Sequence, residues 1–183
     1  MRKVVAAMNM TLDGYCDHTA GIADAELHQY YTDLLNESGT VLYGRITYKL
    51  MEDYWPSVVK NPTGDKALDE FGIALENIPK VVFSHTLKGL AWKNVSLARR
   101  ELSDEVSALK QENGKDILVG SPSLIVALTK LNLIDEYKLC IHPVVLGSGL
   151  PLFKTISETV ILKRIEIKLF GSGSVAIRYE RGR

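Results

Sequence analysis

The sequence has few cysteines, no long apolar run and no excess of charge of either sign. Cys16 and Cys140 are its two cysteines, and they lie far apart with no CxxC pair, which favours free thiols over a disulfide. No run approaches the roughly 18 apolar residues of a membrane span. Lysine plus arginine and aspartate plus glutamate both total 22. Because nucleic-acid and anionic-membrane binders usually carry a positive excess, neither partner is expected.

Several catalytic motifs are also missing. The sequence contains no GxGxxG, Walker A, HExxH or GxSxG, and its four histidines have no metal-ligand spacing. Metal-assisted and covalent chemistry are therefore not expected, and no metal site is predicted. The apolar run near the N-terminus, residues 4–8, is shorter than a signal peptide requires and is interpreted as a strand. We expect a cytoplasmic protein.

The patterns that are present predict one mixed α/β domain over residues 1–183. Four apolar runs do not alternate with polar residues, so each is predicted to be a strand buried on both faces of a parallel sheet. They span residues 4–8, 40–43, 80–83 and 116–119. Helical spacing of apolar residues lies between them, at 26–36 and 101–113. Strands that alternate with helices indicate right-handed βαβ crossovers.

The C-terminal third has a different pattern. Apolar residues alternate with polar ones at 137–142, 164–169 and 175–179, which indicates antiparallel strands, with a turn at Gly171-Ser172-Gly173. The alternation slips by one residue near Lys163 and predicts a β-bulge there. Residues 55–63 contain two prolines and are predicted to form a surface loop.

Three of the buried strands end in residues that suit the close approach of a ligand. The pairs are Gly44 with Arg45, Ser84 with Thr86, and Gly120 with Ser121. Parallel strands share one carboxyl edge, where open α/β sheets bind nucleotides.

At the third of these ends, Ser121 can act as the N-cap of a helix and Pro122 suits its first position. The free N–H groups of Ser123 and Leu124 would then face an anion, although a plain strand-to-helix turn explains the same residues. Arg45 can pair with a phosphate, or can simply be a surface arginine.

The loop after the first strand, residues 9–15, contains the turn pair Asp13-Gly14 and leaves the same sheet edge, so it could cover a bound ring. Asp24 and Glu26 open the first helix. The helix dipole alone favours acids there, so they carry function only if the fold places them in the site.

Taken in order, TLDGY, LYGRITY, VVFSHTL, ILVGSPSL and LIDEYKLCIHPVVLGSGLPLF resemble the dihydrofolate reductase-like family. This family includes the reductase domain of the bacterial bifunctional riboflavin-biosynthesis deaminase-reductase, and the resemblance covers residues 3 to 180. It implies a three-layer α/β/α fold with a mostly parallel mixed sheet and an antiparallel C-terminal hairpin. It also implies NADPH as cofactor, and suggests a homodimer formed through the C-terminal strands.

The resemblance also assigns residues to parts of the site. Those implied to contact the cofactor are Ala7, Gly44, Arg45, Thr47, Ser84, Thr86, Gly120, Ser121, Ser123 and Leu124. Those implied to lie near the substrate are Asn9, Gly14, Leu146, Gly147 and Gly149. Relatives often have Gly-Gly where this chain has Gly120-Ser121, a departure at the pyrophosphate. The zinc deaminase signature HxE…PCxxC is absent, so no deamination is expected.

Together these features predict an NADPH-dependent reductase that transfers hydride to a C=N or C=O group of a small heterocyclic, ribosylamino-pyrimidine or pterin-like substrate. The implied activity is of the 5-amino-6-(5-phosphoribosylamino)uracil reductase type. Asp13, or an acid at Asp24 or Glu26, would orient the substrate or relay a proton. Two alternatives stay open: a nucleotide-binding regulatory module of the same fold without turnover, and an interaction protein whose cleft is filled by side chains.

Overall fold

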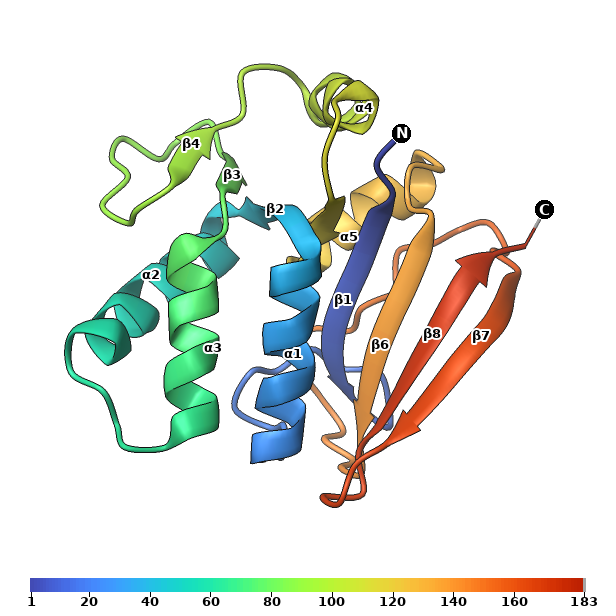
Figure 1. Cartoon of the computed structure of the whole chain (residues 1–183). Coiled ribbons are helices and arrows are strands. Elements are labelled where there is room, and N and C mark those ends of the chain that lie inside the picture. Colours follow the sequence, from blue (N-terminus) through green and yellow to red (C-terminus); the bar gives the residue numbers. More distant parts are fainter. Residues whose placement is uncertain (183) are drawn as a thin grey trace.

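The structure is a computed structural model that describes residues 1–182 and has the predicted three-layer α/β/α architecture (Figure 1). Its centre is an eight-stranded sheet with the strand order β4-β3-β2-β5-β1-β6-β8-β7. The strands are Val4–Thr11 (β1), Ser38–Gly44 (β2), Lys80–Phe83 (β3), Val95–Leu97 (β4), Asp116–Val119 (β5), Glu136–His142 (β6), Leu162–Leu169 (β7) and Val175–Arg181 (β8). The helices are Ala25–Glu37 (α1), Arg45–Lys60 (α2), Lys66–Asn77 (α3), Leu102–Gln111 (α4) and Pro122–Lys130 (α5).

The sheet is parallel from β4 to β6 and antiparallel beyond it. β8 pairs antiparallel with β6, and β7 pairs antiparallel with β8. This confirms the predicted C-terminal hairpin on a mostly parallel sheet. The register of β7 shifts between Arg164 and Glu166, one to three residues after the bulge predicted near Lys163. The slip in apolar parity therefore located the bulge closely.

Each face of the sheet has its own core, which explains why the strand runs are apolar without alternation. Val4 and Ala6 of β1 pack on the face that α4 and α5 cover, whereas Val5 and Ala7 pack on the face covered by α1, α2 and α3. Figure 1 shows α1 and α3 in front of the sheet and α5 behind it. A strand with helices on both faces has no solvent-facing side chains to make polar.

The surface loop predicted at residues 55–63 is wrong for its first six residues, which continue α2 to Lys60. Pro56 stands in the last turns of that helix and removes one backbone hydrogen bond. The cost is offset by packing, since the Trp55 ring meets Phe71 of α3 at 4.8 Å between centroids. Gly72 of α3 lets Val58 approach, because an added Cβ would lie 3.4 Å from Val58 Cγ1.

Two elements were not predicted from the sequence, namely α3 and the three-residue strand β4. The signal for α3 was present: Asp65 precedes an amphipathic run, and its carboxylate accepts hydrogen bonds from the N–H groups of Ala67 and Leu68. In β4, Ser96 and Leu97 are both exposed, so this strand has no apolar alternation that could predict it.

Both cysteines are free thiols, as predicted. Burial raises the pKa of Cys16 to about 11 and that of Cys140 to about 12, so neither forms a thiolate at neutral pH. Within residues 1–182, no group of three or more histidine, cysteine, aspartate or glutamate side chains could hold a metal ion. In the same described part of the chain, no helix is long and apolar enough to cross a membrane.

Candidate active site at the carboxyl edge of the sheet

The carboxyl ends of the parallel strands form one edge of the sheet, and this edge is uneven. In Figure 1, β1 and β6 reach lowest in the view. Strand β5 ends at Val119, which pairs with Ala6 of β1. Strand β1 continues to Thr11 and pairs over that length only with β6, on its other side. Residues 7–11 of β1 therefore have one side without a neighbouring strand. We call this place the β5 step.

The turns that follow β2 and β5 are tied together on the other side of β5. The N–H of Gly44 donates a hydrogen bond of 2.9 Å to Oγ of Ser121, and Ser121 is fully buried. Ser121 and Pro122 take the predicted N-cap and first-turn positions of α5. The expected side-chain cap is wrong, however, because the Ser121 hydroxyl forms no hydrogen bond within α5. It faces Gly44 instead.

This tie brings the N-termini of α2 and α5 together. Neither helix has a side-chain cap, and neither has an acidic residue in its first turn. The first backbone N–H groups of a helix have no partner within it, and together with the helix dipole they favour an anion. Arg45 and Ser123 are exposed here, Thr47 is half-buried, and Leu124 turns its side chain into the core. Two convergent N-termini and a guanidinium suit the phosphates of a dinucleotide.

Glycine is needed at both strand ends, for different reasons. A Cβ on Gly44 would lie 3.3 Å from Oγ of the exposed Ser123, so this backbone faces the open turn of α5. A Cβ on Gly120 would lie 3.0 Å from Cε1 of Tyr43, which is tighter than such contacts normally are. Packing against Tyr43 is therefore sufficient to explain Gly120, without any ligand.

Ser84 and Thr86 follow β3, the next strand after β2 along the same edge. Oγ of Ser84 accepts hydrogen bonds from the N–H groups of Thr86 (3.2 Å) and Leu87 (3.0 Å). Thr86 is exposed. The turn is thus capped by its own serine, and the strand ends at Gly120, Gly44 and Ser84 follow one another along the edge as an extended ligand requires.

On the other side of β1, Asp13 joins the loop after β1 to the loop after β6. Its carboxylate accepts hydrogen bonds from the Thr11 hydroxyl (2.6 Å) and from the N–H groups of Leu146 (3.1 Å) and Gly147 (2.7 Å). These bonds, that of Thr11 first, lower the pKa of Asp13 to about 2. Asp13 is therefore ionised at neutral pH, which suits an anchor and does not suit a proton donor.

The predicted substrate wall is assembled by the same contacts. Gly14, Gly147 and Gly149 all have positive φ, at 89°, 78° and 136°, where a side chain would be strained. A Cβ on Gly149 would lie 3.5 Å from the Tyr15 ring. Leu146 is half-buried beside them. The turn at residues 13–14 and the loop at 146–149 are distant in sequence and adjacent at the end of β1 and β6.

Asp24 and Glu26 face the β7–β8 turn. Asp24 caps α1 by accepting the N–H of Leu27 (2.7 Å), and this bond is the main cause of its lowered pKa. The Glu26 carboxylate accepts the N–H of Gly171 (2.9 Å). β8 and β7 are the second and third strands from β1, on the side opposite the β5 step. Oγ of Ser174 in that turn contacts Nδ1 of His142, at the end of β6, at 3.1 Å.

Sequence reasoning missed one residue beside the site, His142, whose ring is 2% exposed at the end of β6. It contacts Asn9, a predicted substrate residue, at 3.1 Å between Nε2 and Oδ1. The only sequence signal was a histidine at the polar position that ends the alternation of residues 137–142. No histidine spacing pointed to it.

Comparison with known proteins identifies the family. A model of the RibD C-terminal domain matches residues 2–176. The chain belongs to the RibD C-terminal domain family. This is a family of reductases, in agreement with the resemblance noted in the sequence. An uncharacterised protein of Bacillus subtilis, YyaP, is 35% identical over 97% of this chain and 94% of its own length.

Solved structures of three other proteins share the fold of this chain. A protein assigned provisionally to riboflavin biosynthesis in Shewanella sp. PV-4 superposes with a TM-score of 0.77 at 19% identity, covering 99% of each chain. A pyrimidine reductase-like protein of Corynebacterium diphtheriae gives 0.69 at 15% identity, covering 100% of this chain and 92% of its own. The Thermotoga maritima diaminohydroxyphosphoribosylaminopyrimidine deaminase/5-amino-6-(5-phosphoribosylamino)uracil reductase gives 0.67 at 18% identity, over 99% of this chain and 57% of that one.

Proposed function

We propose that the protein is an NADPH-dependent reductase of a small heterocycle, of the 5-amino-6-(5-phosphoribosylamino)uracil reductase type. The observation that carries the proposal is the pair of uncapped helix N-termini of α2 and α5, joined by the Gly44–Ser121 hydrogen bond and flanked by Arg45. Family membership supports reduction in general, and the anion site supports a phosphorylated cofactor.

The residues have separate tasks in this proposal. The first-turn N–H groups of α2 and α5, with Arg45, would hold the phosphates of NADPH, and the turn after β3 would lie along its adenosine half. When bound, NADPH supplies the hydride. The open side of β1 at residues 7–11 would orient the ring that reacts, while the loop at 146–149, anchored by Asp13, would form one wall of the site.

Reduction of a C=N or C=O bond also needs a proton. Asp13 is ionised at neutral pH, and the carboxylates of Asp24 and Glu26 accept hydrogen bonds from the N–H groups of Leu27 and Gly171. None of the three is placed as a proton donor. We therefore propose that solvent water delivers the proton, so that kcat should show no ionisation of a protein acid near pH 4–7.

A thermal-shift measurement tests the cofactor. We expect NADPH near 1 mM to raise the melting temperature, since a ligand at 100 times its dissociation constant stabilises a protein by about 2.7 kcal/mol. NADH should raise the melting temperature less. Absence of any shift with NADPH would refute the proposal, and binding without oxidation of NADPH by any pyrimidine or pterin would favour the regulatory module.

Replacement of Arg45 tests the phosphate contact. Arg45→Ala should weaken NADPH binding by about 1.5–3 kcal/mol, because a guanidinium–phosphate pair is lost. Arg164→Ala on β7, also an exposed arginine, is the matched control and should leave the affinity unchanged. Equal affinities of the two variants in calorimetry would remove Arg45 from the site.

We also propose that the chain forms a homodimer through its C-terminal hairpin. β7 is an edge strand that pairs only with β8, and its apolar residues Ile167 and Leu169 are 44% and 74% exposed. An edge strand with exposed apolar residues on one face can associate with a second strand. Light scattering should give a dimer for the native chain and a monomer for Leu169→Lys; a native monomer would contradict the proposal.

A further inference from the structure

Asn9 lies in a partly buried hydrogen-bond network that joins β1 to α1 and β6. Its side-chain oxygen, Oδ1, is contacted by the Tyr31 hydroxyl of α1 at 2.9 Å and by Nε2 of His142 at 3.1 Å. An amide oxygen accepts two hydrogen bonds, so two donors at these distances fill its capacity.

The other ring nitrogen of His142 determines which way this network runs. The backbone N–H of Ile22 points to Nδ1 of His142 at 3.1 Å, and a backbone N–H can only donate. Oγ of Ser174 lies at the same distance from Nδ1. Nδ1 is therefore an acceptor. A neutral ring must then carry its proton on Nε2, from which it donates to Asn9.

The surroundings of His142 favour the neutral ring. It is 2% exposed, and an added Cβ on Gly21 would lie 3.3 Å from its Cε1, so the loop before α1 covers it closely. Burial is the main cause that lowers its pKa, while the charge of Asp24 opposes this in part.

The orientation of the Asn9 amide follows from the histidine tautomer. Because His142 donates, Asn9 must turn Oδ1 toward it and Nδ2 away from it. Among the described residues, Nδ2 has no hydrogen-bond partner, and Asn9 is only half-buried. The amide NH2 is thus an oriented donor that is left for a ligand.

Asn9 stands where the reacting ring of a substrate is expected. It follows Ala7 by two residues on the same face of β1, about 7 Å along the strand. Both belong to the part of β1 beyond the end of β5, in the step where the cofactor and substrate rings would meet.

We propose that Asn9 determines substrate specificity by donating from Nδ2 to a ring carbonyl oxygen of the heterocycle, with His142 and Tyr31 as positioning residues. The site thereby selects an oxo-pyrimidine over an analogue with an amino group at the contacted carbon. An amino group at that carbon would be a second donor facing the NH2 of Asn9, so that neither donor would have an acceptor. This inference rests on the proposed reductase function.

Asn9→Asp is the sharpest test, because it keeps an acceptor for both Tyr31 and His142 and replaces the amide donor toward the ligand with a negatively charged acceptor, which repels a carbonyl oxygen. Affinity for 5-amino-6-(5-phosphoribosylamino)uracil is measured by calorimetry in protein saturated with NADP⁺, which prevents turnover. We expect a loss of about ten- to hundredfold in Asn9→Asp, with NADP⁺ affinity unchanged. Equal affinity of Asn9→Asp and the native chain overturns the inference.

Two replacements of His142 test positioning. The glutamine amide in His142→Gln reaches about as far as Nε2 and still donates to Asn9, whereas the shorter amide in His142→Asn does not. We expect His142→Asn to weaken uracil binding by about three- to tenfold and His142→Gln to recover most of it. A residue needed only for folding would reduce uracil and NADP⁺ binding together in both variants, which contradicts the positioning role.

Nitrogen NMR of the native chain reads the tautomer without any ligand. Protonation on Nε2 supports the inference, and protonation on Nδ1 overturns it. If the native chain binds NADPH but not the uracil probe, the inference fails while the cofactor site stands. If it does not bind NADPH, the proposed reductase function itself fails.

Discussion

The helix N-termini of this protein fall into two contrasting groups. α1 and α3 begin with Asp24 and Asp65, whose carboxylates accept the first backbone N–H groups of each helix. α2 and α5 begin at Gly44 and Ser121, and neither has a side-chain cap. The first pair of helices satisfies its own donors and contributes to stability. The second pair leaves its first N–H donors without a side-chain cap, as the proposed phosphate contact requires.

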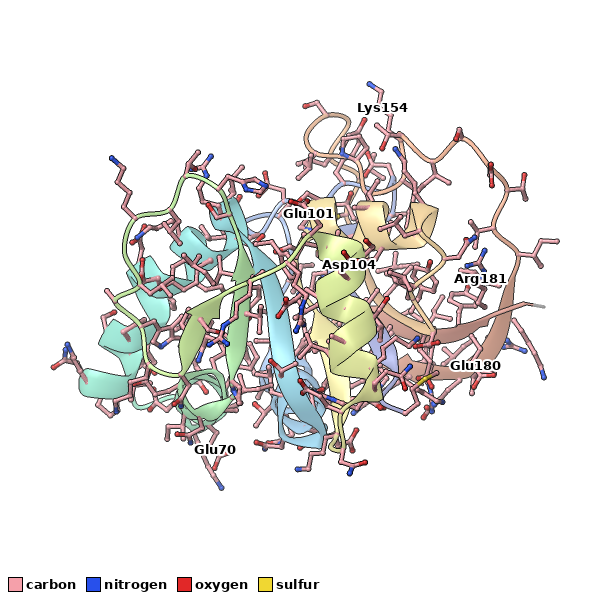
Figure 2. The ribbon with its side chains drawn as sticks, turned by 90° about the horizontal axis from the view of Figure 1, so that it is seen from above. Glu70, Glu101, Asp104, Lys154, Glu180 and Arg181 are labelled. Carbon is pink, nitrogen blue, oxygen red and sulfur yellow. The ribbon has the colours of Figure 1, made fainter. Side chains whose placement is uncertain are left out.

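α4 shows that the missing cap alone does not mark a site. It also lacks a side-chain cap, yet its first turn carries Asp104 and Glu105. Figure 2 shows Glu101 and Asp104 at the same end of this helix. Negative side chains there repel a phosphate. What distinguishes α2 and α5 is the absence of both a cap and an acid.

The largest effect is expected for Ser121→Ala, which breaks the tie between the two uncapped helices. The N–H of Gly44 would lose its partner inside the protein. Leaving a buried donor unpaired costs about 1–3 kcal/mol, and the free energy of unfolding in urea should fall by that amount. NADPH affinity should fall as well.

Ser123→Ala is the control for Ser121→Ala, because Ser123 lies two residues later in the same turn and is exposed. Its loss should change stability by less than about 0.5 kcal/mol. If the two variants unfold at the same urea concentration, the hydrogen bond from Gly44 does not hold this edge together.

Ile46→Glu would give α2 a first-turn acid, which α1, α3 and α4 have. Ile46 is 76% exposed in the first turn, so the change disturbs no packing. The helix dipole predicts a gain in stability of about 0.3–1 kcal/mol. Repulsion of a phosphate about 6 Å away predicts a loss in NADPH affinity of about tenfold. The free energy of unfolding should therefore rise while the affinity for NADPH falls.

Ile46→Gln is the uncharged control for that replacement and should leave both quantities close to native. Thermal melting and calorimetry of the two variants separate charge from shape. A glutamate that leaves NADPH binding untouched would place the phosphates away from α2.

Asp65→Ala tests the opposite group of helices. It removes the cap of α3, which accepts the N–H groups of Ala67 and Leu68, and should cost about 1 kcal/mol of unfolding free energy. NADPH affinity should not change. A loss of affinity as large as the loss of stability would mean that capped and uncapped helices do not have separate roles.

The smallest effect is expected in acid. The folded-state pKa of Asp24 is lowered, so the unfolded chain binds a proton before the native chain does as the pH falls below about 4. Its contribution to stability is therefore present above pH 4 and lost as the pH falls through the folded pKa. Asn caps helices equally well without titrating, so Asp24→Asn should lose less stability between pH 5 and pH 3. If the urea midpoints of the native chain and Asp24→Asn fall by the same amount between pH 5 and pH 3, ionisation of this cap does not contribute to the pH dependence of stability.

Much of the site could be predicted because strand ends have recognisable residues. Gly44 with Arg45, and Gly120 with Ser121, were located from the sequence since parallel strands share one carboxyl edge. The hydrogen bond between Gly44 and Ser121 could not be predicted, because the two residues are 77 positions apart and their contact depends on the pairing of β2 with β5. The local sequence favours a side-chain N-cap at Ser121, but its hydroxyl accepts the N–H of Gly44 from the end of β2 instead.

The same distinction holds for the acids and for His142. Asp13, Asp24 and Glu26 were reasonable candidates from position alone. Asp24 accepts a hydrogen bond from its own helix, and only partners in distant loops decided that Asp13 and Glu26 act as acceptors. The chain order of apolar runs, glycines and helix patterns determined the α/β fold, the parallel sheet and the edge that carries the site. The tertiary structure decided which donors remain free there, because hydrogen bonds between distant strands and loops have no local sequence signal.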